Sequence, residues 1–482
     1  MTRILAIDAG TTGVRAIVFD ERGRRLGSDY VELSMHYPRP GWAEQDATEI
    51  WRATQSVIAG ALHDAGIAPG QIETLGVTNQ RSSIVAWDAR TLAPLPPMIS
   101  WQDVRAAARA SELQAQGFFV TPNVSVSKAE WILRNVAGAK AAAREGTLRL
   151  GGMETWLVAK LTNGAHVSDH ANASATGFYA HMDAKWDAAL LSAVEIPDGA
   201  MPELVPSSGQ IAWTSAEGFG ARVTLAGLCG DQQAALFGLA CVNDGDTKCS
   251  YGTSAMVDCA TGGTITLRGP GVYPLVAWTL EGESDTAWCV EGSVITAGAA
   301  VQWLRDALRV AETAEEIGAL AATVSDTAGV WMVPALQGLG TPFTDSNARG
   351  LIGGLSRGSG RAHIARALLE GIAQRVCDVA EAVWQGVSSP RVVRVDGGAS
   401  RNDLLMQIQS DVLGMPIERS AEPDGSALGV ARLAGRAVGL VDLNASATWA
   451  PDRVFYPQRV AADREAMREK WRERIELAAR AE

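Results

Sequence analysis

The chain opens with two short apolar runs separated by a turn of small residues. Residues 4–7 are apolar, residues 8–13 read DAGTTG, and residues 14–19 are again mostly apolar. This order predicts a β-hairpin. It returns at residue 246, where DTKCSYGTSAMVDCATGG places a second turn, at residues 252–254, between two further runs. The two halves of the chain are therefore predicted to share one plan.

A strand followed by a helix also occurs in each half. The pattern predicts a strand before Gly230 with a helix after Asp231, and a strand before Asp396 with a helix after Ser400. This second repeated pattern predicts two α/β domains, residues 1–242 and 243–482, with a cleft between them. Ligands favour such clefts.

Helical spacing and one proline-rich link complete the predicted elements. We expect a loop at residues 90–99, which contain three prolines. Helices are predicted at residues 48–64, 127–134, 299–308, 361–384 and 462–481.

Composition narrows the functional classes. The 482 residues exceed what one hydrophobic core usually serves, about 250–300 residues, in agreement with two domains. The formal net charge of −12 comes from scattered acidic residues, and the one dense basic stretch, in the last twenty residues, is interleaved with Glu. A nucleic-acid surface needs massed Lys and Arg. This distribution therefore argues against nucleic acid and predicts a solvated terminal helix.

The cysteines and the N-terminus bear on location. The six cysteines form no CxxC pair and have no regular spacing with the six histidines, so we expect buried free thiols instead of a zinc site or disulfides. The apolar run before Asp8 is too short for a signal peptide or a membrane span. A reducing cytoplasm and no membrane partner are expected.

Three turns are candidates for phosphate binding. In DAGTTG, small residues let backbone N–H groups approach a phosphate, Thr11 and Thr12 add hydroxyl donors, and Asp8 could hold magnesium. The YGTS turn at residues 251–254 could clamp the same phosphates, and DGGAS at residues 396–400 leaves room for a flat base. The alternative is that these are ordinary hairpin and strand-to-helix turns.

Asp231 is the candidate acid-base residue. It follows a predicted strand end, so its carboxylate would project into the cleft, while the amides of Gln232 and Gln233 reach substrate hydroxyls. Its alternative role is that of a helix N-cap.

Two further segments carry candidate substrate contacts. Arg81 lies in TNQRSS, and Trp101 and Asp103 lie in SWQD. Polyhydroxyl ligands suit charged donors, carboxylates and an aromatic wall. A surface ion pair or a core tryptophan is the alternative for each.

This combination of motifs resembles the FGGY carbohydrate kinases and, within them, is most similar to the glycerol kinase branch. The matching motifs run in order from residue 4 to about residue 436: DAGTTGVRAIVFD, VTNQR, SWQD, ETWLVAKLT, GDQQAALFG, YGTS, EGSVITAGAAVQWLRD, ARGLIGGLSRG, ALLEGIA and DGGASRNDLLMQIQSD.

The resemblance implies a fold and a set of site residues. The implied fold is α/β, with two actin-like ATPase (ribonuclease H-like) domains and a central nucleotide and substrate cleft that binds ATP and Mg²⁺. Asp231 matches the general base, Asp8 and Asp231 match the magnesium site, and Arg81, Trp101, Asp231 and Gln232 match the substrate pocket. The implied nucleotide contacts are Thr11, Thr12, Arg15, Gly252, Thr253, Gly298, Gln302, Gly398, Ala399 and Asn402.

Three positions depart from the glycerol kinase pattern. Ser82 stands where those kinases carry Glu beside the pocket Arg, Asn123 where they carry Tyr, and Met256 where they carry Phe. A lost carboxylate and smaller walls leave glycerol with fewer partners and enlarge the cavity. These changes suit a larger polyol or a ketose.

The first hypothesis is therefore a kinase that transfers the γ-phosphoryl group of ATP to a hydroxyl of a small sugar or polyol. The alternatives are glycerol kinase proper and a catalytically silent sugar- or ATP-binding module, which the three altered positions would fit. A chaperone-like ATPase shares the fold, but no substrate-binding appendage is expected after the second domain. The sequence leaves open the acceptor, the carbon phosphorylated, regulation and the oligomeric state, for which a homodimer is one candidate.

Overall fold

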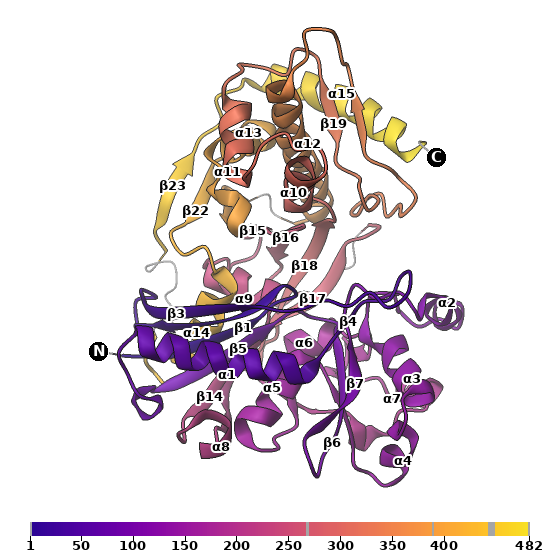
Figure 1. The fold of residues 1–482 in the computed structure, drawn as a ribbon, viewed down its shortest axis with the longest axis vertical. Helices are drawn as coiled ribbons and strands as arrows, with labels where there is room; N and C mark the ends of the chain where they lie inside the picture. Colours follow the sequence, from indigo (N-terminus) through magenta and orange to yellow (C-terminus); the bar gives the residue numbers. More distant parts are fainter. Residues whose placement is uncertain (1, 267–268, 388–389, 442–448, 481–482) are drawn as a thin grey trace. The chain divides into compact units, whose positions relative to one another are not determined.

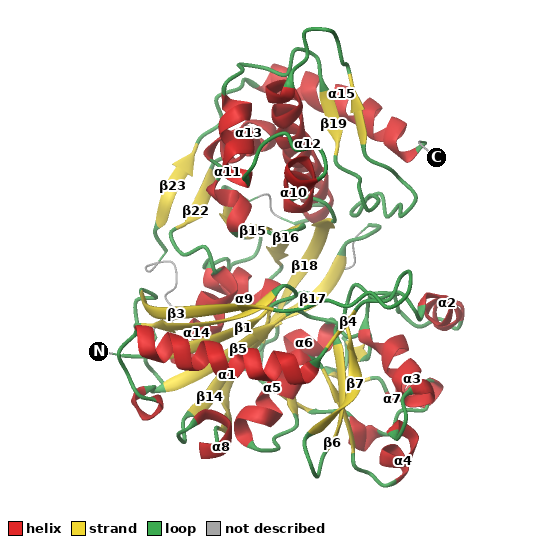
Figure 2. Ribbon diagram, in the orientation of Figure 1, coloured by secondary structure: helices red, strands yellow, loops and turns green. Residues whose placement is uncertain are grey.

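The computed structural model describes residues 2–266, 269–387, 390–441 and 449–480. The chain forms two compact units and crosses between them several times. The first unit contains Met1–Gly238, Leu275–Ala287 and Ser426–Thr448, and the second contains Leu239–Pro274, Trp288–Gly425 and Trp449–Glu482. Figures 1 and 2 show that each unit combines a sheet with helices.

The first unit is built on a six-stranded sheet with the order β13-β14-β5-β1-β2-β3. Strands β1 (Ile4–Ala9) and β2 (Gly13–Phe19) form the predicted hairpin. β1 also pairs in parallel with β5 (Thr74–Asn79), which pairs in parallel with β14 (Thr224–Gly230). The three parallel strands are buried along almost their whole length, as expected for a sheet covered on both faces. Helix α1 (Ala47–Asp64) packs into the hydrophobic core on one face.

A second helix covers the other face where two neighbouring strands carry glycine. Helix α14 (Gly425–Ala437) passes over Gly76 of β5 and Gly227 of β14. A Cβ atom on Gly76 or Gly227 would lie 2.6 or 2.7 Å from the carbonyl oxygen of Val430. Glycine is needed at both positions because the helix backbone approaches so closely.

The first unit also contains a four-stranded sheet with the order β4-β7-β6-β8. The predicted loop at residues 90–99 is wrong, because β7 (Ala93–Ile99) is a strand. β7 pairs with β6 (Ile84–Asp88), but it pairs with β4 (Glu44–Gln45) only at its last two residues. Its prolines, at positions 94, 96 and 97, lie beyond the reach of β4. Proline is tolerated on such an unpaired edge, because no neighbouring strand there needs the N–H donor that proline lacks.

The second unit repeats the sheet order of the first. This sheet has seven strands in the order β17-β18-β16-β15-β21-β22-β23, and the six from β18 to β23 follow the order of the first sheet. β15 (Thr247–Tyr251) and β16 (Ala255–Ala260) form the second predicted hairpin. β15 also pairs in parallel with β21 (Val393–Asp396), which pairs in parallel with β22 (Ile417–Ser420). The two halves of the chain share one plan, as predicted.

The strands that correspond between the halves differ from those that the sequence indicates. Counted outward from each hairpin, β21 takes the place of β5 and β22 takes the place of β14. The strand before Asp396 is therefore equivalent to the strand before Gln80, and not to the strand before Gly230. The sequence comparison failed here because parallel strands of an α/β sheet commonly end in similar polar turns, which do not reveal the strand order.

The five predicted helices are confirmed, with small differences at their ends. Residue 481 of the last predicted helix lies outside the described residues. The helices not yet given are α2 Ala107–Ala115, α3 Ser125–Asn135, α4 Ala139–Arg144, α5 Met153–Thr162, α6 His170–Ser174, α7 Ala188–Ala193, α8 Ala216–Phe219, α9 Asp231–Gly238, α10 Gly298–Asp306, α11 Ala314–Ala322, α12 Arg361–Val383, α13 Asp403–Leu413 and α15 Ala461–Ala479. The remaining strands are β3 Arg25–Glu32, β8 Leu148–Gly151, β9 Val167–Asp169, β10 Tyr179–Ala180, β11 Lys185–Trp186, β12 Glu203–Val205, β13 Ser208–Trp213, β17 Tyr273–Trp278, β18 Ala287–Val294, β19 Trp331–Val333, β20 Leu351–Gly353 and β23 Pro451–Phe455.

Three predictions from composition can be compared with the structure. All six cysteines are buried and free, as predicted. Most residues of α15 are exposed, which confirms a solvated helix, although Arg468 and Trp471 are buried. Among the helices of the described residues, none is long and apolar enough to cross a membrane.

Candidate active site

The ends of three parallel strands lie side by side in the first unit. Ala9 of β1 is paired with Asn79 of β5, and Asn79 is paired with Gly230 of β14. The residues that follow these strands are the first Gly/Thr turn (residues 10–13), Gln80 with Arg81, and Asp231 with Gln232. Carboxyl ends of parallel strands are the usual place for ligands in α/β sheets. The sequence positions predicted for the first half thus gather at one edge.

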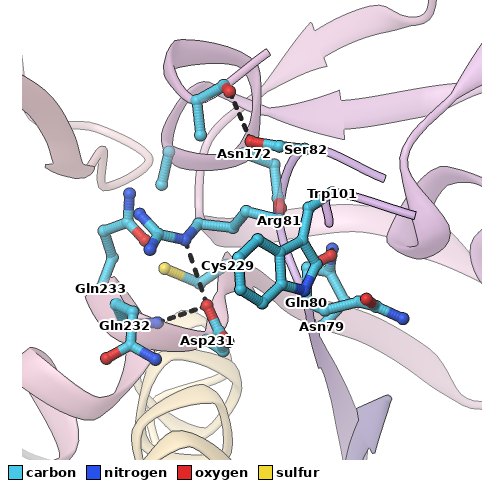
Figure 3. A network of polar contacts seen from close by, with 12 residues as sticks. Asn79, Gln80, Arg81, Ser82, Trp101, Asn172, Cys229, Asp231, Gln232 and Gln233 are labelled. Atoms are coloured by element: carbon cyan, nitrogen blue, oxygen red, sulfur yellow. Dashed lines mark hydrogen bonds and ion pairs between the residues drawn. The ribbon is translucent and has the colours of Figure 1, made fainter. Parts of the chain in front are cut away.

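Arg81 and Asp231 form an ion pair at this edge. The Nε atom of Arg81 lies 3.1 Å from Oδ1 of Asp231, and the side chains are 11% and 26% exposed. The same carboxylate oxygen accepts the backbone N–H of Gln232 at 2.8 Å. Figure 3 shows both contacts and the side chain of Arg81 directed at the carboxylate. Asp231 is the first residue of α9, and it remains partly accessible.

The first Gly/Thr turn is held by side-chain contacts as well as by its own backbone. The N–H of Gly10 donates to the carbonyl of Gly13 at 2.9 Å. The hydroxyl of Thr11 donates to Oε1 of Gln80 at 3.2 Å and accepts the indole N–H of Trp101 at 3.0 Å. The hydroxyl of Thr11 is thus used within the protein, whereas Thr12 is exposed.

Asp8 and Arg15 lie next to this turn on paired strands. Asp8 of β1 is opposite Arg15 of β2, and it is also beside Thr78 of β5. The guanidinium carbon of Arg15 lies 5.1 Å from the ring centre of Tyr30, a cation–π distance. Both residues are half-buried, so each keeps an accessible part.

A buried lysine holds the loops that carry Trp101 and its neighbours. The ammonium group of Lys128 donates to the carbonyl oxygens of Ser82, Ser100 and Asn123 at 3.2, 3.0 and 2.6 Å. Lys128 is fully buried, and burial lowers its pKa to about 7. Three main-chain acceptors around one ammonium group fix three separate loops relative to one another.

Two of the altered positions lie on those loops. Ser82 has a φ of 62°, and its hydroxyl donates to the carbonyl of Ala175 at 2.7 Å. The side chain of Asn123 is exposed and donates to the carbonyl of Trp101 at 3.0 Å. Met256, the third altered position, lies on β16 of the second unit and is half-buried. Ser82 and Asn123 therefore supply neither a carboxylate nor an aromatic surface beside Arg81.

Two sequence candidates have structural roles instead. Asp103 is completely buried, accepts the N–H of Ala43 at 2.6 Å and pairs with Arg105 at 2.7 Å, so it is not a substrate contact. Gln233 is also completely buried, and its amide donates to the carbonyl of Val276 at 3.4 Å. In both cases the side chain lies in the interior, which a strand-end motif does not reveal.

The second unit brings its predicted residues together around the second Gly/Thr turn (residues 252–254). The N–H of Gly298, the first residue of α10, donates to the carbonyl of Gly252 at 3.1 Å. The N–H groups of Ala297 and Ala299 donate to the carbonyl of Thr253 at 3.1 and 3.0 Å. A Cβ atom on Gly298 would lie 2.4 Å from the carbonyl oxygen of Gly252. Glycine is therefore required at the start of α10.

The DGGAS turn lies against the same hairpin. Asp396 of β21 accepts the hydroxyl of Ser250 at 2.5 Å, and burial raises the pKa of Asp396. Gly397 has a φ of 85°, and a Cβ atom there would lie 2.5 Å from the carbonyl oxygen of Tyr251. The two turns are packed together so closely that only glycine fits between them.

The remaining predicted nucleotide contacts follow these turns along the chain. Gly398 is exposed and Ala399 is half-buried, both in the 3₁₀ turn Gly398–Arg401. Asn402 caps helix α13, because its side-chain oxygen accepts the N–H of Leu405 at 3.1 Å. Gln302 is exposed on α10, one turn after Gly298.

Gln80 and Lys128 are buried residues that hold segments of the candidate site, and neither is among the residues predicted from the sequence. Gln80 stands directly before Arg81 in the TNQRSS motif, so its position at a strand end was a usable signal. Lys128 falls in a predicted helix of ordinary composition. Nothing in the sequence indicates that this lysine is buried.

Known proteins resemble this chain along its whole length. Plasmodium falciparum glycerol kinase, in a crystal structure with ADP, matches with a TM-score of 0.91 and 29% identity, covering 99% of this chain and 98% of that one. Rhodospirillum rubrum xylulose kinase matches with a TM-score of 0.83 and 25% identity, covering 99% and 98%. Glycerol kinases from Geobacter sp. (strain M21) and Bordetella parapertussis are each 42% identical, covering 99% and 98% of this chain and 99% and 97% of their own.

The repeated sheet, with polar strand ends in each unit, is the actin-like ATPase fold of ATP-dependent phosphotransferases that act on an alcohol group. Residues 3–238 match the FGGY family of carbohydrate kinases, N-terminal domain, and residues 247–438 match the C-terminal domain of the same family. The chain belongs to the FGGY family of carbohydrate kinases. The resemblance given by the sequence motifs is confirmed.

Proposed function

We propose that this kinase phosphorylates a small sugar or polyol and that Asp231 is its general base. The observation that supports the proposal is the partly accessible carboxylate of Asp231 at a strand end, oriented by Arg81 and by the N–H of Gln232. A carboxylate accepts the proton of an attacking hydroxyl only when it is held within hydrogen-bond reach and remains accessible. Asp231 meets the second condition and is pre-oriented for the first.

The acceptor would bind between charged, amide and aromatic groups of the first unit. Arg81 and Gln232 offer hydrogen-bond donors to hydroxyl oxygens, and the ring of Trp101 offers a flat wall to the carbon chain. Trp101 keeps its orientation through its indole N–H, which Thr11 accepts. We assign these three residues, with Asp231, to acceptor binding.

The nucleotide residues divide between the units. In the first unit we assign the first Gly/Thr turn, with Thr11, Thr12 and Arg15, to the phosphates. The hydroxyl of Thr11 already makes two hydrogen bonds within the protein, so we assign its main-chain N–H to phosphate. Thr12 is exposed, and we assign its hydroxyl to phosphate. In the second unit we assign Gly252, Thr253, Gly298 and Gln302 to the phosphates, and Gly398, Ala399 and Asn402 to the adenosine.

The acidic residues of the first unit fit a magnesium ion. In the part of the chain that the structure describes, no group of three or more Asp, Glu, His or Cys residues could hold a metal by itself. Mg²⁺ in kinases needs only one or two carboxylates, because phosphates and water complete its shell. Asp8 and Asp231 stand two strands apart at the same sheet edge, and we propose that they hold it through water. When bound, Mg²⁺ would neutralise charge on the transferred phosphoryl group.

The acceptor proposed is longer than glycerol. The Ser82 hydroxyl donates to the carbonyl of Ala175 and the Asn123 amide donates to the carbonyl of Trp101, so neither position supplies the carboxylate or the aromatic ring of the glycerol kinase pattern. A four- or five-carbon polyol or a ketose would suit a site that lacks these two groups. Glycerol is the second candidate, since the 42% identical relatives are named glycerol kinases.

Two further assignments follow from the sequence. We propose that residues 1–242 act as the N-terminal kinase domain, with the acceptor site, and residues 243–482 as the C-terminal domain, with the adenosine site. We also propose a cytoplasmic location, which six buried free thiols support because they suit a reducing compartment.

An acceptor panel tests the proposal. Purified protein with ATP and Mg²⁺ should release ADP only when a suitable acceptor is present, and kcat/KM should be higher for a tetritol, a pentitol or a ketose than for glycerol. Glycerol as the best acceptor would refute the longer-acceptor assignment and leave the kinase intact. ATP binding without turnover on any acceptor would support the catalytically silent module.

A further inference from the structure

The side-chain amide of Gln80 is buried and makes every hydrogen bond available to it. Its oxygen accepts the hydroxyls of Thr11 and Ser83, both at 3.2 Å. Its nitrogen donates to Oε1 of Gln45 at 2.8 Å and to the carbonyl of Gly10 at 3.4 Å. An amide has two acceptor sites and two donors, and all four are occupied. Gln80 is only 2% exposed.

These bonds close a network between the first Gly/Thr turn and the acceptor wall. The indole N–H of Trp101 donates to Thr11 Oγ1 at 3.0 Å, and the backbone N–H of Trp101 donates to Ser83 Oγ at 3.0 Å. Thr11 and Ser83 both donate to Gln80 in turn. Trp101 is therefore connected to Gln80 twice, once through its side chain and once through its backbone.

The backbone of the turn is fixed by the same network. Gln80 binds the carbonyl of Gly10, and the Nε2 atom of Gln45 donates to the carbonyl of Thr11 at 3.0 Å. A turn of small residues has many backbone conformations, so two buried amides on successive carbonyls select one of them. The direction of the N–H groups in the turn then depends on where Gln80 and Gln45 lie.

We propose that Gln80 is a positioning residue that couples the acceptor site to the phosphate-binding turn. The inference rests on the proposed function, in which Trp101 faces the acceptor and residues 10–13 face the nucleotide. Being buried, Gln80 acts through Thr11 and Trp101 and does not touch either substrate. An acceptor that fixes the ring of Trp101 thereby fixes Thr11 and the turn, and by linkage a bound nucleotide favours the acceptor-binding position of Trp101.

A double-mutant cycle on nucleotide binding tests this coupling without needing an acceptor. The probe is the Mg²⁺ complex of a non-hydrolysable ATP analogue, and its Kd is measured for the wild type, Trp101→Phe, Gln80→Glu and the double variant. Trp101→Phe removes the indole N–H, and Gln80→Glu removes both donors while keeping the size. We expect Trp101→Phe to raise Kd about 5-fold with Gln80 present and less than about 2-fold with Gln80→Glu, since coupled residues are not additive.

Thr74→Val is the matched control. Thr74 is buried at the start of β5, the strand that ends just before Gln80, and it donates to the carbonyl of Thr224 at 3.0 Å. With Thr74→Val, the effect of Trp101→Phe should stay about 5-fold, because a loss of stability lowers the folded fraction and leaves the coupling unchanged. If Gln80→Glu does not fold, Thr11→Val takes its place in the cycle, because the Thr11 hydroxyl joins Trp101 to Gln80.

Two results would overturn the inference. One is an equal effect of Trp101→Phe on Kd with and without Gln80, and the other is no effect in either background. Failure of the proposed function looks different, because absence of phosphorylation on every acceptor leaves the nucleotide-binding cycle measurable.

Discussion

Arg81 and Asp231 are 150 positions apart in the chain, and their side chains meet with Nε of Arg81 3.1 Å from Oδ1 of Asp231. They meet because β5 and β14 are parallel neighbours that end together, with Asn79 beside Gly230. The guanidinium group orients the carboxylate while 26% of the Asp231 side chain stays exposed. In the proposed mechanism, an approaching hydroxyl meets a carboxylate that is already in position.

Asp231→Asn tests the general base. The substitution keeps the size of the side chain and removes its ability to accept a proton, so we expect kcat to fall by about 10²–10⁴-fold. The Kd of a non-hydrolysable ATP analogue without Mg²⁺ should change less than about 2-fold, as measured by calorimetry. Asp183→Asn, on a side chain that is 59% exposed, is the control and should keep full activity. A kcat near that of the wild type in Asp231→Asn would exclude the assignment.

Lys128→Met should disturb both stability and acceptor binding. Its ammonium group is the shared donor to three carbonyls, and its removal leaves them, at least partly buried, without that partner. We expect a loss of roughly 2–4 kcal/mol in the free energy of unfolding, measured with denaturant, and a rise of about 10-fold in the KM for the acceptor. Lys128→Arg should not rescue, since the wider guanidinium group has no space at a fully buried position. Lys185→Met, on an exposed side chain, serves as the control, and equal stability of Lys128→Met would contradict the role.

Gly397→Ala should weaken nucleotide binding. The residue has a φ of 85°, and its new Cβ would lie 2.5 Å from the carbonyl oxygen of Tyr251, so the two turns of the second unit must separate. We expect the KM for ATP to rise at least 10-fold while the KM for the acceptor changes little. Gly329→Ala is a matched control, because Gly329 has a φ of 84° and open space around its Cβ. A KM for ATP in Gly397→Ala equal to that in Gly329→Ala would contradict the role of the contact between the two turns.

Burial of His166 makes the protein less stable at acidic pH. Burial lowers its pKa from 6.5 to about 4, while its ring nitrogen contacts the carbonyl of Leu150 at 2.9 Å. Between pH 6.5 and 4 the unfolded chain binds a proton that the folded protein does not, so the free energy of unfolding falls as the pH falls. Above pH 6.5 His166 causes no loss of stability, and at pH 5 it has lowered the free energy of unfolding by about 2 kcal/mol.

His166→Gln separates this effect from other titrations. Glutamine can still donate to the carbonyl of Leu150 but does not titrate in this range. The free energy of unfolding, measured with denaturant, should fall between pH 8 and pH 5 by about 2 kcal/mol less in His166→Gln than in the wild type. An unchanged difference between the two pH values would mean that the ring is protonated in the folded protein.

The sequence predicted those parts of the site that follow from local pattern. Both hairpins, the strand ends before Gly230 and Asp396, and the acid Asp231 after one of them are visible as apolar runs that stop at a polar turn. Such signals are local because a strand and its turn are formed by consecutive residues. Burial is not local, and this is why Asp103 was predicted as a substrate contact and Lys128 was not noticed.

By itself, the sequence determined the family, the repeated hairpins and the polar residues available at the strand ends. Only the tertiary structure decided which strands correspond between the halves, namely β21 with β5. It also decided which side chains are in contact: Trp101 donates to Thr11, and Thr11 donates to Gln80. The physical reason is that strand order and hydrogen-bond partners are set by packing between segments far apart in the chain. No spacing along the sequence records that packing.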